Sequence, residues 1–241
     1  MLRTAKAAIA GLVRRLGYEI IPGAFAPTMD AALARLSRRL TIGTLIDVGA
    51  SDGRWTRNAL RHFPEASSLL FEAQEEAHGE ALRRFAQFDR RVRVVLAAAG
   101  DRRGEIYFDV SDPFSGVAMR QPASGSEIKV PMTTIDAEVA RLGLKPPYLL
   151  KLDTHGFEAP ILEGARKTIA EANALVIEAY NFTLREGALR FHELCGHLDE
   201  LGFRCADLAD PMWRERDGLL WQMDLFFLPK ARPEFAQNGY R

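Results

Sequence analysis

The alternation of short apolar runs with helical segments is the feature that most constrains the fold of this chain. An apolar run at 45–48 ends in a glycine turn and is followed by a helical pattern at 55–63. The order repeats with a strand at 68–72, a helix at 77–88 and a valine-rich strand at 92–98. Strands that alternate with helices pair in parallel, and the connecting helices cover the faces of the sheet. The sequence therefore predicts an α/β fold.

The second half of the chain interrupts this order once and then resumes it. Between 104 and 134, an alternating apolar pattern and a turn-rich stretch predict an inserted hairpin or flap. The elements predicted after it are a helix at 135–142, a strand at 148–152, a helix that starts near 158, a strand at 174–179, a helix at 186–201 and strands at 203–207 and 219–228. The short link between the last two strands favours an antiparallel pair at the end of the sheet.

A chain of 241 residues is long enough for one large domain, which we predict at 41–230. We expect a helical segment at 1–40 to pack on the core and a tail to follow at 231–241. Thr28 can cap a helix in the first segment. Residues 1–17 are mildly cationic and amphipathic, so contact with a membrane surface is the alternative to packing. No apolar run reaches the length of a membrane span, and we expect no stable membrane insertion.

The charge balance argues against nucleic acid as a partner. The 32 Lys and Arg residues equal the 32 Asp and Glu residues, so no overall positive field attracts a phosphate backbone. Cys195 and Cys205 lack metal-binding spacing and are interpreted as apolar residues of a reducing compartment, which predicts a cytoplasmic protein. We expect a small-molecule or glycan partner, and the sequence does not indicate the oligomeric state.

The candidate site lies at the carboxyl ends of the strands, where open parallel sheets bind ligands. Gly49 and Gly53 allow a tight turn after the first strand, and Asp47 can offer a carboxylate to a cationic amine. Glu72 follows the second strand, where such folds bind the hydroxyls of a ribose. The turn lacks the middle glycine of GxGxxG, which lets the backbone approach a pyrophosphate. This absence favours S-adenosylmethionine over a dinucleotide.

Five blocks of the sequence resemble, in order, the blocks of the FkbM family of methyltransferases. They read IDVGASDGRWT, LLFEAQ, VVLAAAGDRRGEIYF, TTIDA and LLKLDTHGFEAPILEGA, and the resemblance covers about 45–181. It implies a Rossmann-like class I methyltransferase fold with a seven-stranded, mostly parallel sheet and helices on both faces. It also implies S-adenosylmethionine as cofactor and the O-methylation of sugar-type hydroxyls.

The resemblance further implies which residues contact the cofactor. Glu72 would take the ribose and Ala98 would lie along the adenine, while the turn after the first strand cradles the methionine portion. The predicted cofactor-binding residues are Asp47, Gly49, Ala50, Ser51, Gly53, Trp55, Glu72, Ala98 and Asp153. The sequence departs from the family pattern at His155, where Glu or Gln is common, and at Ser51-Asp52, where Asn is common in the second position.

His155 is the candidate general base, because a hydroxyl must lose its proton when it is methylated. A histidine titrates near neutrality, and Asp153 can orient it or position the acceptor. The alternative interpretation of His155 is a polar turn residue. Asp153, His155 and Glu178 could also hold a divalent metal, although their spacing has no strong metal signature and we do not favour one. Lys151 lies inside an apolar strand and is expected to pair with a carboxylate.

The predicted acceptor contacts follow the next strand or lie in the flap at 114–125: Glu178, Tyr180, Asn181 and Ser115. The leading hypothesis is a methyltransferase that acts on a hydroxyl of a sugar, glycan precursor or secondary metabolite. The alternatives are a non-catalytic module that binds a nucleoside or a protein, and a nicotinamide-dependent oxidoreductase.

Overall fold

The computed structural model describes residues 2–122 and 125–240, with residues 2–8 described by their backbone alone. Residues 123 and 124 of the predicted flap lie outside this description, as do the first residue of the predicted N-terminal segment and the last residue of the tail. Among the described residues, no helix is long and apolar enough to cross a membrane.

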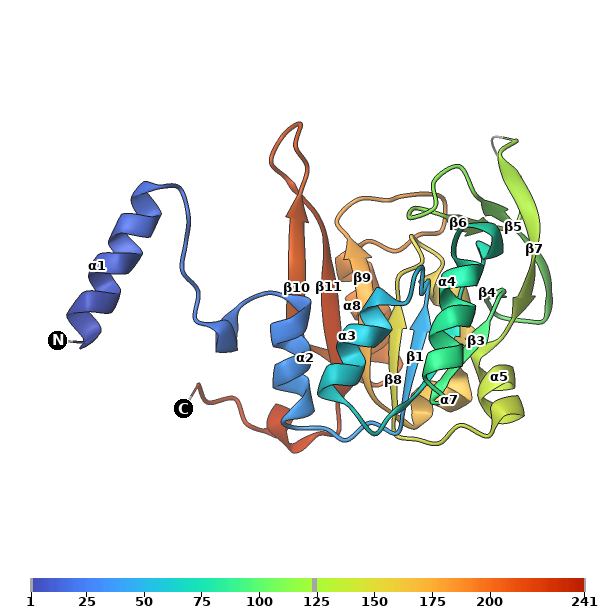
Figure 1. Ribbon diagram of the computed structural model, residues 1–241, viewed down its shortest axis with the longest axis horizontal. Coiled ribbons are helices and arrows are strands. Elements are labelled where there is room, and N and C mark those ends of the chain that lie inside the picture. Colours follow the sequence, from blue (N-terminus) through green and yellow to red (C-terminus); the bar gives the residue numbers. More distant parts are fainter. Residues whose placement is uncertain (1, 123–124, 241) are drawn as a thin grey trace.

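Seven strands form the central sheet, which Figure 1 shows with its strands upright. Their order is β10-β11-β9-β8-β1-β2-β3, and β11 runs antiparallel to both of its neighbours while the other pairs are parallel. The strands are β1 Thr44–Val48, β2 Ser67–Phe71, β3 Val92–Val95, β8 Tyr148–Leu152, β9 Ala172–Tyr180, β10 Phe203–Trp213 and β11 Leu220–Pro229. The predicted Rossmann-like, mostly parallel sheet is confirmed, as is its closing antiparallel pair.

Helices cover both faces of this sheet (Figure 1). Alternate residues of a strand point to opposite faces, so Leu149 packs in the apolar cluster of one face and Leu150 in the cluster of the other. The first face carries α2 Met29–Ser37, α3 Arg54–His62 and α4 Glu75–Phe88. The second face carries α5 Ile135–Leu142, α6 Glu158–Glu163, α7 Arg166–Ala170 and α8 Phe191–Glu200.

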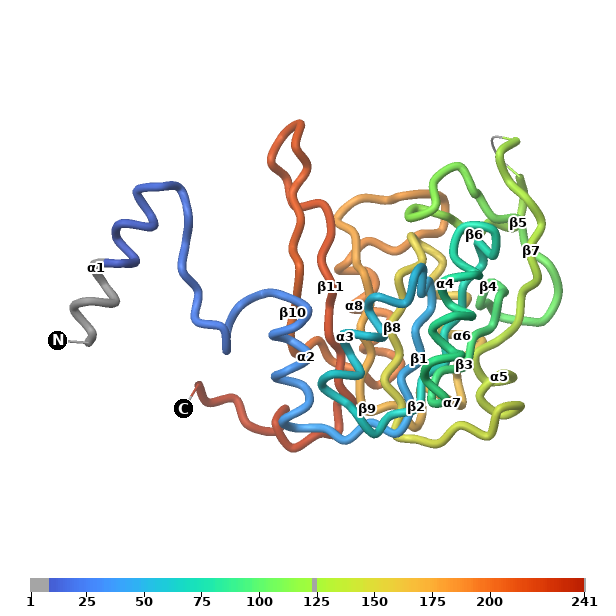
Figure 2. The backbone as a smooth tube through the Cα atoms, in the orientation of Figure 1, coloured from blue at the N-terminus to red at the C-terminus, as the bar shows by residue number. Residues whose placement is uncertain are grey.

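The inserted region is larger than the predicted hairpin. It forms a second sheet in the order β4-β7-β5-β6, which comprises β4 Ala98–Ala99, β5 Gly104–Asp109, β6 Val117–Met119 and β7 Glu127–Thr133. The predicted strand at 92–98 is therefore divided between the two sheets. The tube in Figure 2 shows that the connection between β5 and β6 lies beside the upper edge of the central sheet. This insertion places residues 112–116 next to the strand ends.

The N-terminal segment divides into two parts. Helix α2 packs on the core through Leu33 and Leu36, and Thr28 caps it by accepting a hydrogen bond from the backbone N–H of Ala31. Helix α1, Leu2–Arg15, stands apart from the domain in Figure 1, and Leu12 is 62% exposed. The expectation that the whole segment packs on the core is therefore wrong for α1. Two short 3-10 helices, η1 Gly23–Phe25 and η2 Pro233–Ala236, flank the domain.

Helix α8 begins later than predicted. The sequence pattern placed its start at 186, but the helix starts at Phe191. Gly187 has a φ of +79°, which is not helical, and the Glu193 side chain accepts a hydrogen bond from the backbone N–H of Arg190. This cap fixes the first turn of the helix and leaves the preceding residues as a loop beside the sheet edge.

The turn after β1 depends on Gly49. Its φ is +76°, and a Cβ atom built on it would lie 2.1 Å from the carbonyl oxygen of Asp153. The backbone N–H groups of Gly49 and Ala50 donate to the carbonyl of Phe71, while the N–H of Asp153 donates to the carbonyl of Val48. The close approach that glycine permits thus brings the ends of β1, β2 and β8 together.

Candidate active site

A cavity of about 510 Å³ opens at the carboxyl ends of the parallel strands, as the sequence predicts for a ligand site in this fold. Its walls come from the turn after β1, the ends of β2 and β8, the second sheet and the first turns of α2 and α3. A single cavity therefore touches elements from both halves of the domain.

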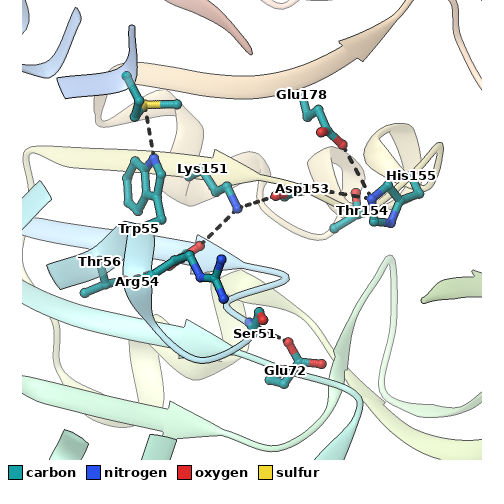
Figure 3. A network of polar contacts seen from close by, with 12 residues as sticks. Ser51, Arg54, Trp55, Thr56, Glu72, Lys151, Asp153, Thr154, His155 and Glu178 are labelled. Carbon is teal, nitrogen blue, oxygen red and sulfur yellow. Dashed lines mark hydrogen bonds and ion pairs between the residues drawn. The ribbon is translucent and has the colours of Figure 1, made fainter. Parts of the chain in front are cut away.

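Glu72 organises the loop side of this cavity. Its carboxylate accepts a hydrogen bond of 2.7 Å from the backbone N–H of Ser51 (Figure 3). It accepts a second one, of 2.8 Å, from the backbone N–H of Gln74. The side chain is buried yet lines the cavity. Each carboxylate oxygen can accept a second hydrogen bond, so Glu72 can hold the loop and still receive two hydroxyls.

The wall beyond Glu72 is apolar. Small side chains at the end of β3 and in β4 leave space, and aromatic side chains close it from the second sheet and from the turn before α6. The residues concerned are Phe71, Ala97, Ala98, Ala99, Phe108, Phe157 and Ile161. An apolar slot beside a carboxylate suits a flat heterocycle attached to a ribose.

Lys151 is a buried cation at the centre of the site. Its Nζ lies 2.8 Å from Asp153 Oδ2 and 3.6 Å from Asp47 Oδ1, and its side chain is only 6% exposed (Figure 3). Burial opposes the charge of Lys151, but the carboxylates of Asp153 and Asp47 outweigh burial and raise its pKa. The predicted pairing of Lys151 with a carboxylate is therefore confirmed, and the lysine links the ends of β1 and β8.

Asp47 is buried beside Lys151. Its carboxylate is fully buried, does not line the cavity, and accepts a hydrogen bond of 2.7 Å from the hydroxyl of Thr56. Burial raises the pKa of Asp47, and the charge of Lys151 opposes that shift. Asp47 Oδ1 lies 3.6 Å from Lys151 Nζ and has no hydrogen-bond partner among the described residues, so this carboxylate faces the buried lysine.

His155 lies at the opposite end of the cavity, between two carboxylates. Its Nε2 is 3.5 Å from Asp153 Oδ1 and 3.5 Å from Glu178 Oε2 (Figure 3). His155 has a φ of +50°, a conformation that is uncommon for a residue with a side chain. This turn directs the imidazole back over the strand ends.

The two carboxylates beside His155 differ in their protonation. Burial opposes the ionised form of Asp153, but Lys151 and His155 overcome this and lower its pKa to about 2. Burial and the nearby charge of Asp153 raise the pKa of Glu178 to about 9. Opposite shifts of this kind are expected when two carboxyl groups share a site with one strong cation.

The flap is held over the cavity by three side chains. The amide of Gln74 donates to the carbonyl oxygens of Asp112 and Pro113, and a ring nitrogen of His78 also meets the Pro113 carbonyl. His155 Nδ1 lies 3.1 Å from the carbonyl oxygen of Gly116. In consequence Phe114 and Gly116 line the cavity, whereas the predicted Ser115 does not.

The side of the cavity that faces α2 and α3 contains residues that the sequence did not single out. They are Met29, Arg54, Asn58, Asp210 and Asp224. Asp224 is the clearest case, because burial raises its pKa to about 7 and it interrupts an otherwise apolar stretch of β11. A lone acid in an apolar strand was the signal that could have identified it.

The predicted site residues fall into two groups. Those that line the cavity are Gly49, Ala50, Ser51, Trp55, Glu72, Ala98, Asp153 and His155. Those that do not line it are Asp47, Gly53, Glu178, Tyr180, Asn181 and Ser115. Gly53 instead begins α3, and Asn181 bonds to the backbone of β11. Tyr180 donates a short hydrogen bond to Glu178, and the Glu178 carboxyl in turn lies 3.5 Å from His155 Nε2.

Comparison with known families identifies the domain. The family model for the methyltransferase FkbM domain matches residues 47–205, which is more than half of the chain. The chain belongs to the FkbM methyltransferase family. The residues matched include the turn after β1, Glu72 and the Asp153–His155 turn, and they extend into β10. No curated protein matches the chain.

Solved structures of methyltransferases show remote similarity. A candidate O-methyltransferase from Klebsiella pneumoniae is 12% identical, with 93% of this chain and 89% of that chain covered and a TM-score of 0.49. A candidate RNA methyltransferase from Pyrococcus horikoshii is 10% identical over 83% and 82% of the two chains, with a TM-score of 0.46. Precorrin-6y C5,15-methyltransferase from Geobacter metallireducens is 12% identical over 83% and 86%, with a TM-score of 0.44. At such distances we infer nothing about the acceptor.

Replacement of Lys151 tests the buried ion pairs. Lys151→Met leaves the carboxylates of Asp47 and Asp153 without their cation, and we expect it to lower the free energy of unfolding by about 3–5 kcal/mol. Lys167→Met, at an exposed position on α7, is the matched control and should change that free energy by less than about 0.5 kcal/mol. Urea unfolding followed by circular dichroism measures both, and equal stability of the two variants would contradict the structural role of Lys151.

Proposed function

We propose that this chain transfers a methyl group from S-adenosylmethionine to a hydroxyl of a sugar, glycan precursor or secondary metabolite. The observation that carries the proposal is the single cavity that joins Glu72 and the β1 turn to Asp153 and His155. Membership of a methyltransferase family supports the reaction type. A cytoplasmic location is part of the same proposal.

The residues at the loop end of the cavity fit the proposed cofactor. Glu72 can take the two ribose hydroxyls, and the apolar slot beside Ala98 has room for the adenine. Asp153 and the β1 turn would face the methionine portion, with Asp153 attracting its cationic groups. When bound, S-adenosylmethionine supplies an electrophilic methyl group. The protein has to bring an acceptor oxygen into line with that group, and positioning of this kind accounts for much of the rate in such reactions.

We propose that His155 and Asp153 activate the acceptor hydroxyl. A carbonyl oxygen only accepts hydrogen bonds, so the contact with Gly116 makes His155 Nδ1 the donor and leaves Nε2 as the nitrogen that can act. Nε2 can accept the proton of the hydroxyl, with the ionised Asp153 stabilising the imidazolium. Alternatively, Nε2 can hold a cation that binds the hydroxyl oxygen. Both routes need His155 and Asp153.

Two other functions stay open to test. A module without catalysis would bind a nucleoside or a protein partner but transfer no methyl group. A nicotinamide-dependent oxidoreductase would be stabilised against heat by nicotinamide dinucleotide and not by S-adenosylmethionine. The presence of Glu72, Asp153 and His155 around one cavity favours an intact catalytic site over the first alternative.

Replacement of Glu72 tests the cofactor site. Glu72→Ala removes the acceptor of the ribose hydroxyls and of two loop N–H groups, so we expect the dissociation constant for S-adenosylhomocysteine to rise at least tenfold. Glu76→Ala, at an exposed position on α4, should leave it unchanged. Isothermal titration calorimetry measures both variants. No binding by the wild-type chain at millimolar ligand would reject the proposed function itself.

Replacement of His155 tests the catalytic assignment. We expect His155→Ala to lower turnover by about 10²-fold or more, because the group that activates the hydroxyl is lost. The dissociation constant for S-adenosylhomocysteine should change by less than threefold. His192→Ala, exposed on α8, is the control. Transfer of a labelled methyl group to a panel of methyl glycosides gives the rates, and an unchanged rate in His155→Ala would remove this residue from the mechanism.

A further inference from the structure

One nitrogen and two carboxylate oxygens converge at the ends of β8 and β9. Asp153 and His155 belong to the turn after β8, and Glu178 comes from the last part of β9. One ligand atom from each of these residues lies within 4.8 Å of the other two. Figure 3 shows the His155 ring facing both carboxyl groups. The three side chains thus come from neighbouring strands and face one point.

The orientation of His155 leaves this point electron-rich. Its Nδ1 donates to the carbonyl of Gly116, so the lone pair of a neutral imidazole is on Nε2. That lone pair faces oxygens of Asp153 and Glu178, each at 3.5 Å and outside ordinary hydrogen-bond distance. The lone pair of His155 and the charge of Asp153 both attract a positive species to this point. A divalent cation between the three atoms would be held by both of them and by an oxygen of Glu178.

The two distances from His155 Nε2 to the carboxyl oxygens fit the ligands of one metal ion better than direct hydrogen bonds between the side chains. Neighbouring ligands of an octahedral ion with bonds of about 2.1 Å are about 3.0 Å apart, and the longer bonds of Ca²⁺ increase this to about 3.5 Å. The two distances from His155 Nε2 are 3.5 Å. Small rotations of the side chains would therefore suffice for coordination. An imidazole together with two carboxylates is a suitable ligand set for divalent first-row ions such as Mn²⁺.

Each of the three residues is also oriented by a further protein group. Lys151 binds the other oxygen of Asp153, and the carbonyl of Gly116 fixes the ring of His155. The Glu178 carboxyl receives hydrogen bonds from the Tyr180 hydroxyl and the Gln222 amide. Partners of this kind commonly orient the ligands of metal sites.

We propose that Asp153, His155 and Glu178 bind one divalent cation at the acceptor end of the cavity. Asp153 and His155 line that cavity, so the remaining coordination positions of the ion face it. Given the proposed function, the acceptor is then a compound with two adjacent hydroxyls, which chelate the ion through their oxygens. Nε2 is then a ligand, and the ion activates the hydroxyl.

Binding of Mn²⁺ alone tests the site without cofactor or acceptor. We expect the full chain, stripped of metal with EDTA, to bind one Mn²⁺ in isothermal titration calorimetry. Glu178→Gln and His155→Ala should each raise the dissociation constant more than tenfold, because the first replaces a carboxylate ligand with a neutral amide and the second removes the ligand nitrogen. Asp224→Asn makes the same change from carboxyl to amide at a residue that lines the cavity but is not one of the three ligands, and should raise the dissociation constant less than threefold. Circular dichroism checks that each variant is folded.

Three results would overturn the proposal. They are the absence of stoichiometric Mn²⁺ binding by the wild-type chain, an equal weakening by Asp224→Asn and Glu178→Gln, and electron spin echo spectra of bound Mn²⁺ without coupling to a coordinated ¹⁴N. The spectra are recorded on the wild-type chain and do not depend on any variant. Binding of S-adenosylhomocysteine, measured without metal, separates the two ideas: if it persists while Mn²⁺ does not bind, only the metal site is rejected.

Discussion

The buried ammonium group of Lys151 is the interaction on which the site depends. It lies between the carboxylate of Asp47, from β1, and that of Asp153, from the turn after β8. Asp47 is fully buried and Asp153 is partly buried, and the two carboxylates would repel each other without a cation. The lysine therefore fixes the relative position of the two strand ends, and with them the loop that carries Gly49 and the turn that carries His155.

The rest of the site follows from the alternation of side chains along the strands. On the face covered by α2 and α3, the sheet is apolar at Val176 and Phe226 and becomes acidic one repeat further on, at Glu178 and Asp224. This change from apolar to acidic side chains occurs beside the first turns of α2 and α3, where the cavity begins. Burial raises the pKa of both Glu178 and Asp224, whereas the pKa of Asp153 is lowered and its carboxylate is ionised.

Much of this arrangement could be predicted from the sequence, because β1, β8 and their glycine turns are local patterns. Glu72 was predictable for the same reason, since it directly follows a strand. The contacts of Asp47 could not be predicted, because only the folded structure shows that Thr56 and Lys151 lie on either side of it. Asp224 stands out as an acid in an apolar strand, but its place in the site depends on the pairing of β11 with β9. The insertion adds β4 and β6 to the predicted hairpin, through their pairings with β7 and β5. Such pairings are set by tertiary packing, which local patterns do not encode.

A crystal structure of the chain with S-adenosylhomocysteine is the measurement that tests the central claim most directly, namely that one cavity holds the cofactor at Glu72 and the acceptor at His155. The account predicts that both ribose hydroxyls lie within hydrogen-bond distance of the Glu72 carboxylate and that the sulfur faces the Asp153–His155 turn. A ribose bound away from Glu72, or a sulfur directed away from His155, would contradict it.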